Sequence, residues 1–305
     1  MSIVSVTMPD AEFRAAGTDL SERRRSGVSS GPLLDIIATG DSGTSWRADG
    51  AATIGALTTI AAIAADERIA AAYPGIAASA EHLATPQIRR LATLGGNLAQ
   101  RTRCWYFRNP HIACLKKGGD ACPARSGNHL YGVAFDLGDC VAPHPSTMAA
   151  ALLAYDAHIV TNRREGVTIA ALLGDGSDGR RDHTLEAGEM IERIVLPPPL
   201  AREYAVYKRA IGRAHAEWPL VEVCARTVVV DSKFQLVRLV AGGIAPVPLR
   251  LTACETTLLG SAATTPAIAE AAKLASSGAN PLPMTNYKLD LLEGLVRDVL
   301  EQLTA

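Results

Sequence analysis

Four of the six cysteines in the sequence fall within one segment and are candidate ligands of a metal centre or an iron–sulfur cluster. They are Cys104, Cys114, Cys122 and Cys140, separated by 9, 7 and 17 residues. This spacing contains no C-x-x-C pair, so the usual signatures of zinc knuckles and ferredoxins are absent. A loop wrapped around a [4Fe–4S] cluster can still supply four single thiolates, because such clusters are held by four cysteines.

The residues around these cysteines favour an anionic cluster. The segment 98–145, here called the cysteine loop, carries an aromatic run, Trp105 to Phe107, that can exclude water. It also carries six cations, which are Arg101, Arg103, Arg108, Lys116, Lys117 and Arg125. We expect these cations to offset the negative charge of a cluster, to lower the pKa values of the thiols and to raise the reduction potential.

Two other interpretations of the cysteine loop stay open: a zinc site, and a surface loop with chance cysteines. His111, His129 and His144 are each able to replace one ligand, but a histidine in a loop is usually solvated, so we keep the four cysteines as the predicted set. Cys224 and Cys254 lie in strand-like contexts and are predicted to be buried apolar residues. In a reducing compartment we expect no disulfides.

Two glycine turns are candidate binding sites for an anion. The first is AAGTDL, residues 15–20, and the second is TLGGN, residues 93–97. Successive free backbone N–H groups in such turns form anion-binding nests, and glycines let a ligand approach the backbone closely. The formal G-x-G-x-x-G match GDGSDG, residues 174–179, is rejected, because it does not join a strand to a helix and its two aspartates would repel a pyrophosphate.

Length and composition indicate a globular protein of about two domains. The chain has 305 residues, 48% of them apolar and 20% charged, and a formal net charge of −1, so no global field attracts it to nucleic acid or to an anionic membrane. The N-terminus has no basic region followed by an apolar region, which argues against a signal peptide. The most apolar window, residues 51–65, is too short to span a bilayer. We therefore expect a cytoplasmic protein.

Periodicity predicts a mixture of helices and strands that would position the turns and the loop. A strand should lead into the first turn, and PLLDII should form another. Helices are expected over 53–65, capped by Thr53, over 75–83, over 146–155, capped by Ser146, over 266–276 and over 288–303. Strands are expected at 158–160, 221–230 and 235–241, with the last two joined at DSK. No catalytic dyad or nucleophile motif is evident, so no catalytic residue is predicted.

Seven motifs, in this order, resemble those of the FAD-binding (medium) subunits of molybdenum hydroxylases, the xanthine dehydrogenase and CO dehydrogenase family. They are AAGTDL, TPQIRRLATLGGNLAQRTRCWYFR, CVAPHPS, LEAGEMIERIVLP, YKRA, GGIAPVPLR and PLPMTNYKLDLLEGLVRDVL. The cysteine loop is similar to the branch of periplasmic aldehyde oxidoreductases and, more distantly, of 4-hydroxybenzoyl-CoA reductase, whose medium subunit carries a [4Fe–4S] cluster besides FAD.

The resemblance implies an α+β fold. A two-lobed, vanillyl-alcohol-oxidase-like FAD-binding domain of the PCMH type would cover residues 1–197 and contain the cysteine loop. A CO-dehydrogenase-flavoprotein C-terminal α/β domain would cover residues 198–305.

The resemblance also implies residues that bind FAD. The first turn would clasp the pyrophosphate with Ala15, Ala16, Gly17, Thr18, Asp19 and Leu20. The second would contribute Thr93, Gly95, Gly96 and Asn97, with Thr85 just before it, while Ile191 in the segment 189–196 and Lys208 in YKRA would lie near the flavin.

Three departures from the family pattern bear on FAD binding. The usual double glycine of the first turn is Ala16-Gly17 here, which requires a negative φ at Ala16. The aspartate that commonly follows HPS is Thr147, so we do not include this position among the contacts. In relatives a further strand and helix precede the first turn, so either the start is displaced or the first lobe is trimmed, and we expect a weaker hold on FAD.

The function implied by the resemblance is electron transfer. The chain would pass electrons from a large subunit with the molybdenum cofactor and a small subunit with [2Fe–2S] centres, through its own [4Fe–4S] cluster and FAD, to an external acceptor. The substrate would be an aldehyde, or an N-heterocycle of the xanthine type. Alternatives are a stand-alone FAD oxidoreductase of the same fold, or a zinc- or cluster-binding scaffold. Co-export with a signal-bearing partner would place the complex in the periplasm.

Overall fold

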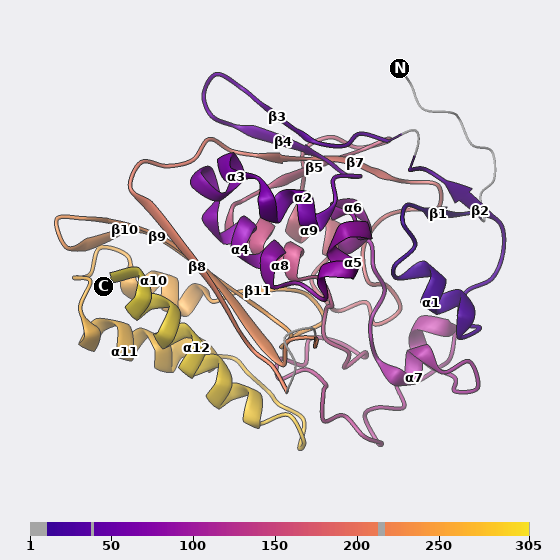
Figure 1. The fold of residues 1–305 in the computed structure, drawn as a ribbon. Coiled ribbons are helices and arrows are strands. Elements are labelled where there is room, and N and C mark those ends of the chain that lie inside the picture. Colours follow the sequence, from indigo (N-terminus) through magenta and orange to yellow (C-terminus); the bar gives the residue numbers. More distant parts are fainter. Residues whose placement is uncertain (1–10, 38–39, 213–216, 305) are drawn as a thin grey trace.

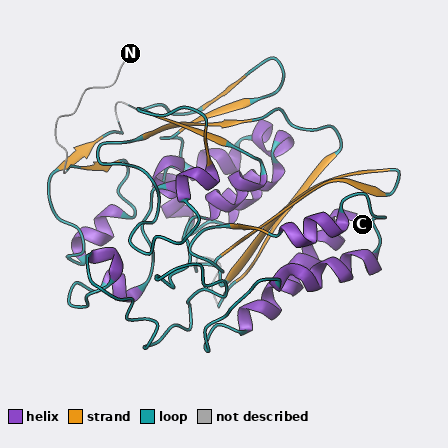
Figure 2. Cartoon of the chain, turned by 180° about the vertical axis from the view of Figure 1, so that it is seen from behind, coloured by secondary structure: helices purple, strands orange, loops and turns teal. Residues whose placement is uncertain are grey.

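The computed structural model describes residues 11–37, 40–212 and 217–304, which form three sheets and the helices that pack on them. Figure 1 shows α2 to α6, α8 and α9 as a layer between a five-stranded and a four-stranded sheet, with α1 and α7 to one side of it. Seen from behind in Figure 2, a second group of helices covers the outer face of the four-stranded sheet. No helix in the described ranges has the length and apolar character needed to cross a membrane.

The N-terminal part of the described chain presents the first glycine turn. Strand β1 (Glu12–Arg14) pairs in parallel with β2 (Leu33–Asp35), and helix α1 (Leu20–Arg25) follows the turn. This confirms the predicted strand that leads into the turn. Gly17 has a left-handed backbone with φ of +72°, whereas Ala16 is not among the residues with positive φ. An alanine is therefore compatible with this turn.

The five-stranded sheet and its helices form the larger core. The strand order is β3 (Thr44–Trp46), β4 (Ala52–Gly55), β7 (Ile191–Leu196), β5 (His158–Thr161) and β6 (Val167–Thr168). The helices are α2 (Ile60–Ala65), α3 (Glu67–Ala72), α4 (Pro74–His82), α5 (Pro86–Leu91), α6 (Leu94–Leu98), α8 (Thr147–Ala154) and α9 (Ile169–Leu173). Ser146 caps α8 as predicted, accepting a hydrogen bond from the N–H of Ala149.

The four-stranded sheet is antiparallel and is covered on both faces. Its order is β11 (Leu249–Arg250), β10 (Lys233–Gly242), β9 (Val221–Val230) and β8 (Glu203–Ala210). The outer face packs on α10 (Thr252–Leu258), α11 (Thr265–Lys273), the 3-10 turn η2 (Leu274–Ser276) and α12 (Tyr287–Thr304). The inner face contributes Tyr207, Cys224 and Val240 to the larger core. Asp231 and Ser232, both with positive φ, make the predicted hairpin turn.

Two predicted local structures are wrong. The helix expected from Thr53 begins later, because residues 52–55 form β4 and Thr59 caps α2. Ile54 and Leu57 have helical spacing with later isoleucines, but a short apolar run does not distinguish a strand from a helix by periodicity alone. Cys254 lies in helix α10 rather than in a strand, although both Cys224 and Cys254 are buried as predicted.

A buried ion pair between β8 and β9 gives a testable contribution to stability. The guanidinium of Arg226 lies 2.8 Å from the Glu203 carboxylate, and each side chain is 4% exposed. We expect Arg226→Met to cost about 3–5 kcal/mol of unfolding free energy, because it leaves a buried carboxylate without its partner. Urea unfolding measures this change. The control is Lys273→Met, which breaks the exposed pair with Glu270 and should cost less than about 1 kcal/mol; equal losses would contradict the prediction.

Candidate cofactor site

The four cysteines of the loop line one narrow pocket. Apart from helix α7 (Trp105–Arg108) and the 3-10 turn η1 (Leu115–Lys117), the cysteine loop from Arg101 to Pro145 has no regular structure. Its folding nevertheless brings together all four predicted ligands, which are Cys104, Cys114, Cys122 and Cys140. Cys114 and Cys140 are buried and the other two are partly buried. The apolar walls of the pocket include Phe107, Leu115 and Ala142.

The sulfur atoms lie against hydrogen-bond donors. The thiols of Cys122 and Cys140 bond to each other, which lowers the pKa of Cys122 to about 5 and raises that of Cys140. Burial raises the pKa of Cys104, against the opposing effect of the N–H groups of Phe107 and Tyr106. Backbone donors directed at sulfur stabilise thiolates and raise the reduction potential of a bound cluster.

The four loop cysteines are the type of donor that iron–sulfur clusters use. In the described parts of the chain, no three histidine, cysteine or acidic side chains are grouped closely enough to hold one metal ion. A [4Fe–4S] cluster is larger than an ion, takes four cysteine thiolates, and does not require its ligands to converge on one point. Four cysteines around one apolar pocket have the right chemistry for that group.

Most cations of the cysteine loop are bound to carboxylates of the protein. Arg101 and Lys116 pair with Asp182, Arg103 and Arg108 with Asp19, and Arg125 with Asp136. Lys117 donates to the carbonyls of Tyr106 and Asn109. Most of these charges are therefore balanced by carboxylates of the protein. Lys116 nevertheless lowers the pKa of Cys140, and Arg125 interacts with Cys122. The sequence identifies the cations, but it does not show which acidic residues the fold places beside them.

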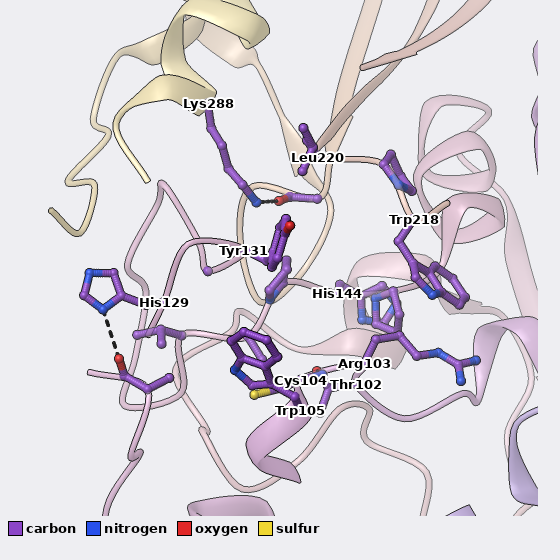
Figure 3. A pocket seen from close by; sticks show the side chains of 18 of the residues that line it. Thr102, Arg103, Cys104, Trp105, His129, Tyr131, His144, Trp218, Leu220 and Lys288 are labelled. Atoms are coloured by element: carbon purple, nitrogen blue, oxygen red, sulfur yellow. Dashed lines mark hydrogen bonds between the residues drawn. The ribbon is translucent and has the colours of Figure 1, made fainter. Parts of the chain in front are cut away.

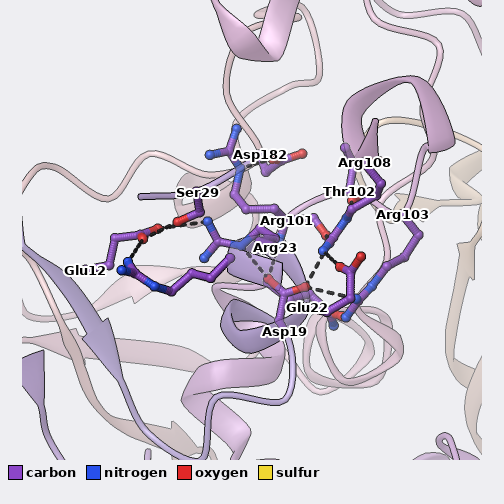
Figure 4. Close-up of polar contacts among 12 residues, drawn as sticks. Glu12, Asp19, Glu22, Arg23, Ser29, Arg101, Thr102, Arg103, Arg108 and Asp182 are labelled. Atoms are coloured by element: carbon purple, nitrogen blue, oxygen red, sulfur yellow. Dashed lines mark hydrogen bonds and ion pairs between the residues drawn. The ribbon is translucent and has the colours of Figure 1, made fainter. Parts of the chain in front are cut away.

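The first glycine turn has the free backbone donors that were predicted. Within the described residues, the N–H groups of Gly17 to Leu20 have no hydrogen-bond acceptor. Such a group of donors suits the oxygens of a pyrophosphate. The carboxylate of Asp19 is directed away from capping α1 and toward arginines of the cysteine loop, as Figure 4 shows. Its negative charge is thereby compensated next to the turn.

The second glycine turn is a short capped helix rather than a nest. The N–H of Gly95 donates to the Ala56 carbonyl at 2.8 Å, that of Gly96 to Thr93 Oγ1 at 3.2 Å, and that of Asn97 to the Thr93 carbonyl. The expectation of free N–H groups is therefore wrong here, because Ala56 and the helix cap Thr93 accept them. Gly95 is needed for close packing, since a Cβ there would lie 2.9 Å from that of Ala56. Gly96 is exposed and offers bare backbone to a ligand.

The two turns lie near each other through the start of the cysteine loop. The backbone N–H of Arg101, four residues after Asn97, donates to the Asp19 carboxylate at 3.2 Å. The side-chain oxygen of Asn97 accepts a hydrogen bond from Ser146 at 2.6 Å. The Arg101–Asp19 bond places the first turn beside the residues that directly follow the second, and there α1 and α7 lie side by side (Figure 1).

Three other predicted residues take part in local structure. Thr85 caps α5, and Ile191 is a buried residue at the start of β7. Lys208 points to the outer face of its sheet, with Nζ 3.8 Å from the Asp298 carboxylate on α12. Tyr207, the preceding residue, faces the helical layer. The structure does not bring Lys208 to either turn, and its place beside the flavin stays a prediction.

A second cavity of about 620 Å³ borders the cysteine pocket. Thr102, Cys104 and Ala142 line both spaces. The larger cavity lies between the cysteine loop and the C-terminal sheet, and Figure 3 shows Trp105, Tyr131 and Trp218 among the side chains around it. Its aromatic, mostly apolar wall suits a planar ring system.

Three buried polar residues line this cavity, and two of them, Glu222 and Lys288, were missed by the sequence analysis. Glu222 accepts hydrogen bonds from Thr147 at 2.8 Å and Tyr207 at 2.6 Å, and burial raises the pKa of its carboxyl. Lys288 donates to the Gly243 carbonyl at 2.7 Å, and burial lowers its pKa to about 7. Burial also lowers the pKa of His144 to about 4. No sequence signal marked Glu222 or Lys288, because charged residues are ordinarily expected on the surface.

Comparison with known proteins decides the family. The family described as the FAD binding domain in molybdopterin dehydrogenase matches residues 3–199. The chain belongs to the FAD-binding medium subunits of the molybdenum hydroxylases. A second family, the CO dehydrogenase flavoprotein C-terminal domain, matches residues 204–303 of this medium subunit.

Relatives of this medium subunit agree in sequence and fold. The aldehyde oxidoreductase FAD-binding subunit PaoB of Escherichia coli K12 is 32% identical over 259 residues, covering 82% of this chain and 80% of PaoB. Carbon monoxide dehydrogenase from Hydrogenophaga pseudoflava has the same fold, with a TM-score of 0.74 at 21% identity over 96% of this chain and 88% of that one. Quinoline 2-oxidoreductase from Pseudomonas putida 86 gives 0.75 at 19% identity, over 97% and 90%.

Proposed function

We propose that this chain is the FAD- and [4Fe–4S]-carrying electron-transfer subunit of a heterotrimeric molybdenum hydroxylase. A large partner would hold the molybdenum cofactor and oxidise the substrate, and a small partner would hold [2Fe–2S] centres. The observation that carries the proposal is that Cys104 lines both the cysteine pocket and the 620 Å³ cavity, so a cluster and a ring system bound there would be neighbours.

The residues proposed to hold FAD are those of the two turns. The N–H groups of Gly17 to Leu20 would bind the pyrophosphate, and the exposed backbone of Gly96 would lie against the cofactor. We infer that the FAD-binding domain, with the cysteine loop, ends near residue 197, since β7 ends at Leu196 and a proline run follows. Residues 198–305 would then close the cavity from the other side.

The residues proposed to hold the cluster are the four cysteines of the loop. Phe107 and Leu115, which are 3% and 6% exposed, shield the pocket of these cysteines from water. Backbone N–H groups around the pocket donate to the sulfurs of Cys104 and Cys122. A cluster there would supply one-electron steps, and FAD would supply the conversion between single electrons and electron pairs. The contribution of the chain is to hold both groups close together and away from water.

An aldehyde is the substrate class that we favour for the complex. PaoB, the curated relative at 32% identity, is named as a subunit of an aldehyde oxidoreductase. The substrate would be selected on the large partner, which would hold the molybdenum cofactor. An N-heterocycle of the xanthine type is the second candidate class.

Anaerobic purification of the chain with co-expressed partners tests the proposal. We expect stoichiometric FAD, about four additional iron and four acid-labile sulfide beyond the small subunit's centres, and bleaching of the flavin and cluster absorbance when an aldehyde is added. Zinc without sulfide in the isolated chain would contradict the cluster. Purification of the chain without partners, with FAD reduced directly by a substrate, would contradict the subunit role.

A further inference from the structure

The carboxylate of Asp19 is held by four donors from two parts of the chain. Oδ1 lies 2.9 Å from Arg103 and 2.8 Å from Arg108. Oδ2 accepts from the Arg23 side chain at 3.1 Å and from the backbone N–H of Arg101 at 3.2 Å. Four donors saturate the acceptor capacity of a carboxylate. Three of them come from the cysteine loop, more than 80 residues away in sequence.

Arg108 extends the same contact to the loop backbone and to α1. Its guanidinium also pairs with Glu22 on α1 and donates to the carbonyls of Arg101 and Thr102. The side chain is only 10% exposed, so these bonds are little weakened by water. Figure 4 shows this group with Asp19 at its centre.

The contact joins the two cofactor sites through adjacent residues. Asp19 is part of the turn whose free N–H groups suit a pyrophosphate, and Arg103 directly precedes Cys104. Helix α7 (Trp105–Arg108) begins directly after Cys104, its N-cap, and ends at Arg108. Arg103 and Arg108 therefore flank the backbone that would be ordered when the Cys104 sulfur binds a cluster. Burial by itself would raise the pKa of Asp19, but Arg103 and Arg108 lower it overall, which keeps the carboxylate charged and bound.

We propose that Asp19 is a positioning residue that couples the first glycine turn to the cysteine loop, so that FAD and the iron–sulfur cluster strengthen each other's binding. The inference rests on the proposed function. A cluster that orders the loop would also order Arg103 and Arg108, and their bonds to Asp19 would then order the first glycine turn. FAD binding would favour cluster binding by the same factor, because coupling between two binding equilibria is symmetric. In this interpretation Arg103 and Arg108 bind the first glycine turn rather than offset the negative charge of the cluster.

A thermodynamic cycle on the purified complex tests the coupling. The FAD dissociation constant is measured by flavin fluorescence with the cluster of this subunit present and after its removal by a chelator, in the wild type and in Asp19→Asn. In the wild type we expect cluster removal to weaken FAD binding about 5- to 100-fold. In Asp19→Asn we expect the ratio between the two states to fall to about 1, because the amide loses the charge that holds the arginines.

The cycle separates coupling from a structural effect of the substitution. A structural effect would weaken FAD binding equally in both cluster states and leave the ratio unchanged, which would overturn the proposal. Should Asp19→Asn not fold, Arg103→Gln removes one of the donors and should give a ratio between those of the wild type and of the uncoupled protein. The matched control is Asp35→Asn, which breaks an exposed pair with Arg14 and should keep the wild-type ratio.

The outcome also distinguishes this inference from the proposed function. A wild-type chain that binds neither FAD nor iron would contradict the proposed function and the coupling together. A wild-type chain that binds both, with an FAD dissociation constant that does not depend on the cluster, would overturn only the coupling.

Discussion

Cys140→Ser should lose most of the iron and acid-labile sulfide that this subunit carries. Cys140 is 7% exposed, lies in the same pocket as the other three loop cysteines, and shares a hydrogen bond with Cys122. A serine hydroxyl in this apolar pocket is a poor ligand for iron, because iron–sulfur clusters are held by thiolates. Iron and sulfide assays on the anaerobically purified complex, corrected for the small subunit, measure the loss.

The control for this substitution is another buried cysteine. Cys254 is fully buried in α10, outside the cysteine loop, and Cys254→Ala should keep the wild-type iron and sulfide content. FAD should be retained by Cys254→Ala and partly lost by Cys140→Ser if the two cofactors are coupled. Full iron and sulfide in Cys140→Ser would show that Cys140 is not a ligand and that the loop cysteines have another role.

Gly17→Val should weaken FAD binding by about tenfold or more, which corresponds to at least about 1.4 kcal/mol. Gly17 has φ of +72°, and a Cβ at this position would lie 2.8 Å from Ser21 Oγ. A β-branched residue in the left-handed region costs about 1–3 kcal/mol, so the turn would relax and move its free N–H groups. The FAD content after gel filtration and the dissociation constant for added FAD measure the effect.

The matched control places the same backbone strain at another turn. Gly43 has φ of +88° and lies before strand β3, outside the first glycine turn. A Cβ added there would have no atom within 4 Å. Gly43→Val should lower the melting temperature by a similar amount while FAD binding stays close to wild type. Equal weakening of FAD binding in both variants would mean that global destabilisation, and not the first turn, is responsible.

Gly17 and Ala16 show how the backbone limits substitution in this turn. The left-handed residue of the turn is Gly17, and Ala16 is not among the residues with positive φ. An alanine in place of the family's first glycine therefore carries no left-handed strain, whereas a side chain at the second does. Ala16 therefore avoids the left-handed region, as the sequence required of an alanine at this position.

Local sequence patterns were sufficient for the family and for several of the elements. Seven motifs in order indicated the medium subunits, and the family match confirms this. The Ser146 cap and the hairpin at residues 231–233 depend on residues close together in the chain. Patterns of this kind reflect hydrogen bonds and side-chain contacts within a few residues, and these can be inferred from order and spacing alone.

The sequence by itself determined the family and predicted which residues would hold the cofactors, and the tertiary structure decided how these residues are arranged. The grouping of four unevenly spaced cysteines, the pairing of loop arginines with Asp19 and the bonding of the second turn's N–H groups to Ala56 and Thr93 all arise from packing. The bond between Arg108 and Asp19 joins residues 89 positions apart. Contacts over such distances depend on the free energy of the whole fold. The entropy cost of closing a loop rises only slowly with its length, so it does not determine which distant residues pair.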